Sequence, residues 1–139
     1  MSTSSEPAGK SLWSLPFVLA AAGNFLHGIG FYCFVHLSGW LDGRGADELL
    51  IGVLFATMAV AAILSRPLVG RVMDTRGRRV VVLIGGGVHM LATAAFVLLD
   101  AKTRGGGLSI WLLVAGVRVI QGVAEAMLFS VLFTIAADL

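Results

Sequence analysis

Four apolar runs, each about as long as a bilayer is thick, limit what this chain can fold into. They cover residues 15–37, 49–69, 80–99 and 108–137 of the 139 residues. A helix needs roughly 20 apolar residues, at about 1.5 Å each, to cross a hydrocarbon core of about 30 Å. Lipid offers no partner for unpaired amides, so each run must be helical, and four segments are too few to close a barrel. The sequence therefore predicts an all-α membrane protein with four transmembrane helices.

Composition supports a membrane protein and argues against other classes. Apolar residues make up 58% of the chain and charged residues 13%, whereas a soluble domain has roughly 45–50% and 25%. The net charge is +2, and the basic residues cluster beside the apolar runs. This placement indicates membrane topology rather than nucleic-acid binding. We therefore expect membrane lipid as a partner and no nucleic acid.

Catalytic and metal-binding patterns are missing from the sequence. Cys33 is the only cysteine, so neither an intramolecular disulfide nor a cysteine metal-ligand spacing exists. Gly85, Gly86 and Gly87 lie inside an apolar run and no Gly-Lys-Ser/Thr follows them, so they do not form a phosphate loop. No nucleophile, base and orienting group occur together. We expect neither an enzyme nor a cofactor or metal.

The loops between the runs predict an orientation. The connection at residues 70–79 carries four arginines, Arg71, Arg76, Arg78 and Arg79, against one acid, Asp74. The other two connections hold fewer basic residues, and basic loops stay in the cytoplasm. The middle loop and both termini are therefore expected in the cytoplasm of a multi-pass inner (plasma) membrane protein. Residues 1–11 are predicted to be a polar cytoplasmic tail. A signal peptide is disfavoured because the apolar run after Lys10 continues too far.

The fourth run contains the strongest intramembrane signal. Arg118, Gln121, Gly122 and Glu125 recur at i, i+3, i+4 and i+7, so they share one helix face. An arginine near the membrane centre costs about 2.5–3.5 kcal/mol even on lenient scales, so it should face a bundle interior or a watery cavity. This face is a candidate functional site. The alternative is an arginine that pairs with Glu125 or with carbonyls only to hold helices together.

The first run places Asn24, His27 and Phe31 on one face, at i, i+3 and i+7. Phe31 is the simplest of the three to explain by packing. Asn24 and His27 are candidates for binding substrate, but interhelical hydrogen bonds worth about 0.6 kcal/mol each explain them more simply. His36 and His89 have no partner in the sequence pattern and receive no role.

Two motifs resemble those of the major facilitator superfamily of secondary transporters. Residues 70–79 are similar to its loop G-x-L-x-D-R-x-G-R-R/K, with Val72 and Thr75 in place of the usual Leu and Arg. Residues 118–122 resemble the R-x-x-Q-G motif of its fourth helix. Both motifs occur on the expected helices and in the expected order. The resemblance implies that residues 12–139 form part of that family's N-terminal six-helix domain.

The resemblance also implies roles for single residues. Arg118, with Gln121, would take part in proton coupling by perturbing the protonation of a carboxylate, for which Glu125 is the candidate. Asp138 would pair with an arginine of the loop, Arg78 first and Arg76 second. The first helix, with Asn24, His27 and Phe31, would turn partly toward a substrate cavity. The conformational gating loop would comprise Gly70, Asp74, Arg76, Gly77, Arg78, Arg79 and Asp138.

The function expected from the resemblance is the N-terminal portion of a secondary active transporter, with proton-coupled efflux of a small molecule. Members have twelve helices in two halves, so the remaining helices are expected partners, together with protons and substrate. A truncated fragment, one part of a split transporter and a complete chain all stay open. So does a non-transporting four-helix membrane interaction protein. The sequence does not separate antiport, symport and uniport, and it names neither the substrate nor the oligomeric state.

Overall fold

The computed structural model describes residues 15–102 and 107–137, and every element in that part of the chain is helical. The elements are, in chain order, α1 (Leu15–Cys33), the short 3-10 helix η1 (Phe34–His36), α2 (Leu37–Asp42), α3 (Glu48–Arg76), α4 (Arg78–Lys102) and α5 (Leu108–Ala137). Four stretches are long and apolar enough to cross a membrane: Phe17–Asp42, Glu48–Arg76, Arg78–Asp100 and Leu108–Val131. The predicted all-α fold with four transmembrane helices is confirmed.

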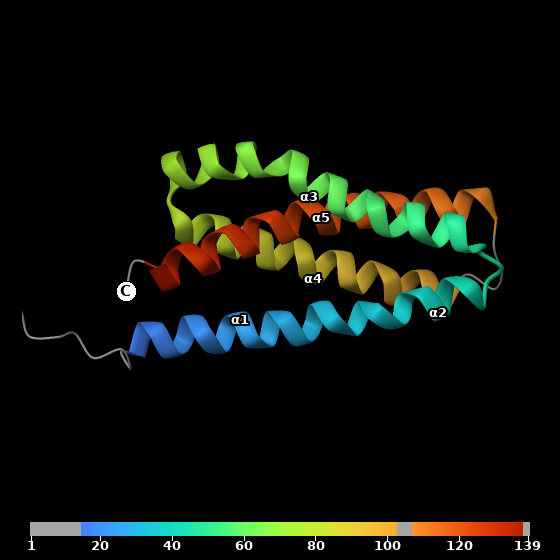
Figure 1. The fold of residues 1–139 in the computed structure, drawn as a ribbon, viewed down its shortest axis with the longest axis horizontal. Helices are drawn as coiled ribbons and strands as arrows, with labels where there is room; N and C mark the ends of the chain where they lie inside the picture. The colour runs from blue at the N-terminus through green and yellow to red at the C-terminus, as the bar shows by residue number, and fades with distance from the viewer. Residues whose placement is uncertain (1–14, 103–106, 138–139) are drawn as a thin grey trace, which may run out of the picture.

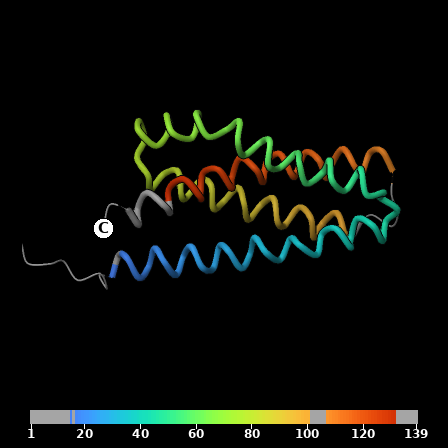
Figure 2. The backbone as a smooth tube through the Cα atoms, in the orientation of Figure 1, coloured from blue at the N-terminus to red at the C-terminus, as the bar shows by residue number. Residues whose placement is uncertain are grey.

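The first span is one continuous rod made of α1, η1 and α2 (Figures 1 and 2). The residues on either side of η1, Cys33 and Leu37, both keep right-handed helical dihedrals. No proline or left-handed glycine interrupts them, so the tighter turn does not break the rod. The rod therefore continues past Leu37 to Asp42 before the chain turns toward α3.

The segment that the sequence analysis treats as a turn, residues 70–79, is almost entirely helical. The helix α3 runs on to Arg76, and Thr75 Oγ1 donates to the Arg71 carbonyl at 2.9 Å within it. Gly77 alone is non-helical, with φ of 81°, and its N–H donates to the Met73 carbonyl. Glycine adopts this left-handed backbone without a Cβ penalty, so α4 can begin at the next residue.

The other end of α3 is capped by Asp47. Its side chain accepts a hydrogen bond from the Leu50 N–H at 2.7 Å, and Glu48 places a second acid in the first turn. Both features stabilise the positive end of the helix dipole. The start of α3 therefore lies with the end of α2 at one end of the bundle, and the Gly77 turn lies at the opposite end (Figure 1).

The last helix, α5, is the one around which the others pack. It lies along both α3 and α4 and also contacts α1. Figure 1 shows it beside α3 for much of its length. The buried residues form two clusters, at the two ends of the bundle. One comprises Leu37, Leu41, Ala46, Leu54 and Val114, and the other comprises Val69, Val81, Ala126, Met127 and Val131.

Two glycines allow α5 to approach its neighbours closely. A Cβ at Gly122 would collide with the Met58 carbonyl oxygen of α3 and lie 3.0 Å from the Ala61 Cβ. A Cβ at Gly85 of α4 would lie 2.8 Å from the Met127 Cβ of α5. In a membrane no hydrophobic force drives helices together, because lipid tails are as apolar as the side chains. Small residues at helix contacts then help by letting the backbones pack tightly. Gly122 is therefore a packing residue whatever else its motif does.

We expect Gly85→Ala and Gly122→Ala to lower the thermal stability of the chain in detergent or lipid. Overpacking a close contact costs about 1–3 kcal/mol, and at Gly122 the obstacle is backbone, which cannot swing away. Matched controls are Gly86→Ala and Gly116→Ala, because a Cβ at either glycine meets nothing within 4 Å. Those two changes should be neutral or stabilising, since alanine is favoured over glycine in a helix by up to about 1 kcal/mol. Equal melting temperatures for all four variants would contradict this account of α5.

Candidate functional site

Ionisable side chains are rare in the interior of the bundle, and four of them lie on three helices. Within α3 no Asp, Glu, Lys, Arg or His occurs between Glu48 and Arg66. Over their membrane-spanning parts, α1 contributes His27, α4 contributes His89, and α5 contributes Arg118 and Glu125. Arg118 is 1% exposed and Glu125 5% exposed. Buried charge of this kind is costly in a membrane, and it generally marks a functional site.

Arg118 is held by neighbours on two helices. Its Nη1 donates to Gln121 Oε1, one turn further along α5, at 2.9 Å. The same nitrogen lies 3.2 Å from the sulfur of Met58 on α3. Gln121 is itself fully buried. Arg118 and Gln121, which the sequence places on one helix face, are therefore joined by a hydrogen bond in the structure.

Three aromatic rings surround the Arg118 guanidinium. Its central carbon lies 4.4, 5.6 and 6.0 Å from the ring centres of Phe55, Phe34 and Phe96. Cation–π attraction contributes on the order of 2 kcal/mol when the cation is desolvated. Arg118 Nε and Nη2, together with Gln121 Nε2, nevertheless have no hydrogen-bond partner. The site thus keeps three buried donor groups that a water, a substrate oxygen or another acceptor can satisfy.

Glu125 is paired with His27, across the contact between α5 and α1. Glu125 Oε2 lies 2.8 Å from His27 Nε2, and the two side chains are 6% and 11% exposed. The separation is that of an ion pair when His27 is protonated, and neither atom has a hydrogen-bond partner. Glu125 Oε1 has no partner either. This pair joins a residue of the Arg118 face to a residue of the first-helix face.

His89 on α4 lies next to this pair. Its ring centre is 5.3 Å from that of His27, in an edge-to-face arrangement. His89 Nδ1 is buried and has no hydrogen-bond partner. The His89 ring centre also lies 6.4 Å from that of Phe34, so Phe34 contacts both His89 and Arg118. The polar interior is therefore one connected region spanning α1, α4 and α5.

The two charged groups of α5 do not meet. No hydrogen bond or ion pair joins Arg118 to Glu125, both of which lie in the described part of the chain. Seven residues separate them, or about 10 Å of helix rise. Of the first-helix face, His27 points into the bundle, Asn24 is exposed and Phe31 is half-buried beside Tyr32. The structure therefore brings His27 to Glu125 and leaves Asn24 outside.

The residues of the gating loop lie around the Gly77 turn. Asp74, Arg76, Gly77 and Arg79 are exposed, whereas Gly70 and Arg78 are partly buried. Asp138 lies outside the described residues, so its expected pairing with Arg78 or Arg76 stays a prediction.

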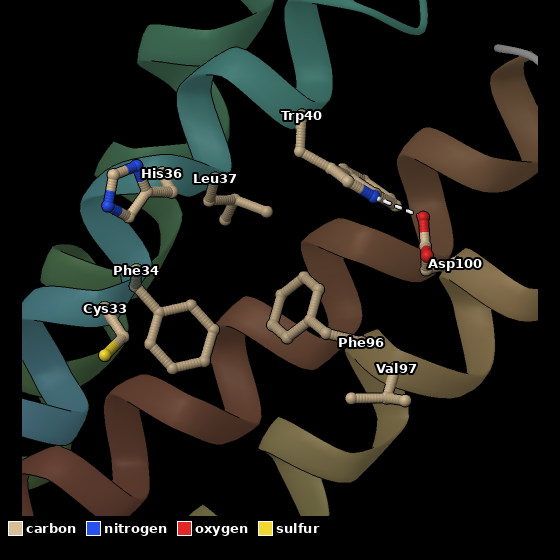
Figure 3. A pocket seen from close by; sticks show the side chains of 8 residues that line it. All are labelled: Cys33, Phe34, His36, Leu37, Trp40, Phe96, Val97 and Asp100. Atoms are coloured by element: carbon tan, nitrogen blue, oxygen red, sulfur yellow. Dashed lines mark hydrogen bonds between the residues drawn. The ribbon is translucent and has the colours of Figure 1, made fainter.

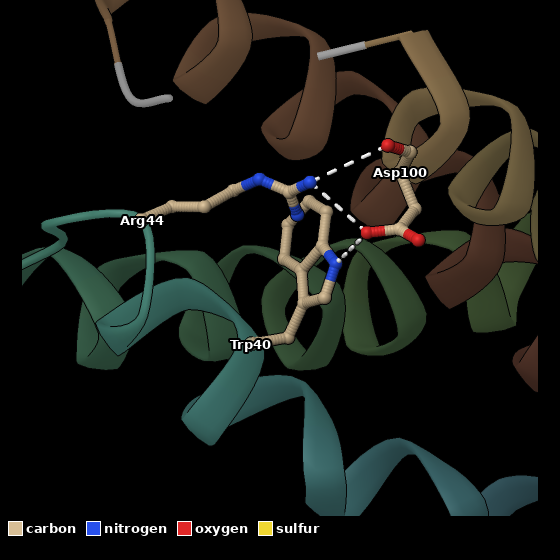
Figure 4. Close-up of polar contacts among 3 residues, drawn as sticks. All are labelled: Trp40, Arg44 and Asp100. Carbon is tan, nitrogen blue, oxygen red and sulfur yellow. Dashed lines mark hydrogen bonds and ion pairs between the residues drawn. The ribbon is translucent and has the colours of Figure 1, made fainter. Parts of the chain in front are cut away.

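A second polar cluster, drawn in Figure 4, lies near the end of α2, and Figure 1 shows that end of the bundle opposite the turn between α3 and α4. Asp100 Oδ1 accepts from Trp40 Nε1 at 2.7 Å and from Arg44 Nη2 at 3.0 Å. The Arg44 guanidinium also stacks over the Trp40 ring, with its carbon 3.8 Å from the ring centre. This cluster fastens the end of α2 and the following loop to the end of α4.

A groove of about 300 Å³ lies beneath this cluster. Figure 3 shows Phe34 and Phe96 opposite each other at its floor, with the Trp40 to Asp100 hydrogen bond above them. The two rings are in edge-to-face contact at 5.4 Å. They also contact the Arg118 guanidinium, so the same pair of rings borders the groove and the buried site. The remaining lining residues are Cys33, His36, Leu37 and Val97.

Sequence reasoning missed the residues that complete the site from other helices. His89, Phe96 and Met58 stand alone in apolar runs, and no local spacing links them to Arg118 or Glu125. Only the crossing of helices brings them together. Within the described residues no group of three or more His, Cys, Asp or Glu residues is arranged to hold a metal ion.

Comparison with known proteins gives one match. The family described as Major Facilitator Superfamily matches residues 18–139. No curated protein and no solved structure matches the chain. The matched segment contains every helix of the structure apart from the first residues of α1.

Proposed function

We propose that this chain, which belongs to the Major Facilitator Superfamily, supplies the first four helices of a proton-coupled exporter of a small molecule. Members of this family are membrane transporters rather than enzymes, and the four apolar helices agree with that. The observation that carries the finer proposal is the buried Arg118, Gln121 and Glu125 face of α5. Residues of this type are expensive within a membrane and are generally kept for transport of ions, protons or polar substrates.

In this proposal Glu125 carries the proton. A carboxylate that is buried in a low-dielectric interior binds a proton more readily than one in water, because burial disfavours its charged form. Arg118 acts over a distance rather than by contact. Two unit charges about 10 Å apart interact by about 1.7 kcal/mol at an effective dielectric constant of 20, which is more than tenfold in an equilibrium. Arg118 therefore stabilises the deprotonated carboxylate enough to let the proton leave.

The three buried donor groups of Arg118 and Gln121 support substrate or water binding at the same place. A protein that needed Arg118 only for packing would be expected to satisfy its donors. The aromatic rings around the guanidinium and the half-buried Phe31 offer an apolar wall for an amphipathic molecule. His27 then belongs to the proton-carrying part of the site, and Asn24 is left for contacts outside the bundle.

The loop around Gly77 is proposed as the conformational gate. Asp74, Arg76, Arg78 and Arg79, with Gly70, Gly77 and Asp138, form a charged end that can pair and unpair with neighbouring helices as the transporter alternates. The arginines also favour placing this end in the cytoplasm of an inner (plasma) membrane, with the N-terminus on the same side. The cluster of Trp40, Arg44 and Asp100 would then close the outer end.

A different class of function is a membrane protein that binds other helices and transports nothing. The large apolar side chains that α1 leaves exposed favour it, among them Leu19, Phe25, Leu26 and Tyr32. Such a face also suits lipid or the remaining helices of a transporter. The donor groups of Arg118 and Gln121 that have no partner favour transport, because side chains kept only to hold helices together would be expected to satisfy them.

We expect Glu125→Gln to abolish proton-driven export while leaving substrate binding measurable. The assay uses inverted vesicles from cells that carry the gene at its native locus, loaded with a pH-sensitive dye. A panel of small organic cations, anions and neutral compounds, beginning with ethidium and tetraphenylphosphonium, identifies a compound that dissipates the proton gradient. Arg118→Lys should lower the proton-coupled rate at least tenfold, because an ammonium group does not reproduce the planar guanidinium.

Matched controls for these variants are Glu48→Gln, at the start of α3, and Arg66→Lys, within the same helix, which both alter exposed residues. Both should transport at wild-type rates. Wild-type coupling in a well-folded Glu125→Gln protein would remove Glu125 from the mechanism. No compound-dependent proton movement with any member of the panel, together with stable binding of other membrane helices, would favour the interaction protein.

We expect single cysteines at Thr75 and Asp42, each in a Cys33→Ser background, to label on opposite sides of the membrane. Both positions are exposed, and they lie near opposite ends of the bundle. An impermeant thiol reagent added to intact cells should label the cysteine at Asp42 and spare the one at Thr75. Labelling at Thr75 in intact cells would reverse the proposed orientation.

A further inference from the structure

The buried carboxylate of the proposed function lies among imidazoles rather than beside an arginine. Glu125 on α5 is 2.8 Å from His27 on α1, and the His27 ring contacts the His89 ring of α4 at 5.3 Å between centres. Both oxygens of Glu125, together with His27 Nε2 and His89 Nδ1, are buried and without a hydrogen-bond partner. Three side chains that can each hold a proton thus lie together on three different helices.

We infer that His27 and Glu125 share one proton and that His89 is the neighbouring imidazole that exchanges it. This inference rests on the proposed proton coupling, and it moves the proton site from α5 alone to the junction of α1, α4 and α5. The transfer is a simple proton movement between a carboxyl oxygen and an imidazole nitrogen. No other bond forms or breaks, and no co-reactant is needed.

Net charge limits how many protons the pair can hold. With one proton the pair is neutral overall, either as imidazolium with carboxylate or as imidazole with carboxylic acid. Losing that proton leaves one negative charge, which Arg118 balances within the same interior. Gaining a second proton would place two positive charges, on the pair and on Arg118, in a buried interior, which is strongly disfavoured. The pair is therefore built to cycle between one shared proton and none.

The helices around this pair add few other charged or histidine side chains within their spans. On α3 there is none between Glu48 and Arg66, and on α4 His89 stands alone between Arg79 and Asp100. On α5 the nearest is Arg118, and α1 has no charged or histidine residue other than His27. His27 and Glu125 therefore form a pair whose neighbouring charged or histidine side chains in the described spans are His89 and Arg118.

The pair also joins α1 to the rest of the bundle. None of the most apolar window of the first span is buried, and α1 makes its main contact with α5. The His27 to Glu125 contact crosses this interface. Loss of the shared proton changes the charge at the contact, so proton release and the seating of α1 are linked. Proton release can therefore change the position of α1 relative to the other helices.

The test uses the whole chain in lipid nanodiscs, labelled with ¹⁵N-histidine. The chain has three histidines, so each imidazole can be assigned with single His→Gln variants and followed by NMR through a pH titration. His27 and His89 should titrate together, and Glu125→Gln should change the proton affinity of His27 roughly tenfold or more. The exposed His36 should not respond, and Glu48→Gln should leave all three curves unchanged.

A His27 titration that Glu125→Gln does not alter would overturn the inference. If that variant does not fold, the wild-type chain still decides: a ¹⁵N–¹³C correlation between the His27 ring and a glutamate carboxyl carbon is expected, and its absence would also overturn it. Linked titration without proton-driven flux would retain the proton site and reject the proposed function. Proton-driven flux that survives His27→Gln and His89→Gln unchanged would retain the function and reject this inference.

Discussion

Hydrocarbon offers no hydrogen-bond partner, and this single constraint governs the whole structure. It forces the backbone into long helices, and it makes a polar side chain in the spans costly unless that side chain finds a partner. Serine and threonine side chains in α3 and α4 meet it by donating to carbonyls one turn back, as Thr57 and Ser65 do. Arg118, Gln121, Glu125 and the two histidines cannot do so, and they collect in one place between helices.

The helix α5 packs against α3, α4 and α1, and it carries the buried polar side chains that they contact. Gly122 and the small residues around it bring α3 close, and Gly85 brings α4 close. The same helix carries the charged face that contacts Met58 and His27. The close helix contacts and the polar site therefore both depend on α5. In this arrangement α1 is attached mainly through α5, which suits an element that moves relative to the rest.

The sequence predicted the four spans, the buried face of α5 and the family, because each depends on local patterns. The length of each apolar run predicts a span. The spacing of three and four residues between Arg118, Gln121 and Glu125 predicts that they share one face of α5. The partners could not be predicted in this way. His89 stands alone in an apolar run, and only the crossing of α1, α4 and α5 places it beside His27. The charged loop was expected as a ten-residue turn, but nothing before Gly77 interrupts the helix, so α3 continues through it.

The central claim of this account is that the buried Glu125 takes up and releases a proton. The most direct measurement is a pH-dependent infrared difference spectrum of the chain in lipid, with glutamate carboxyl carbons labelled by ¹³C. We predict a label-sensitive band of a protonated, water-shielded carboxyl group that disappears as the pH rises and that is missing from the Glu125→Gln protein. A Glu125 carboxyl whose protonation state stays fixed across the titration, in a folded wild-type chain, would contradict the account.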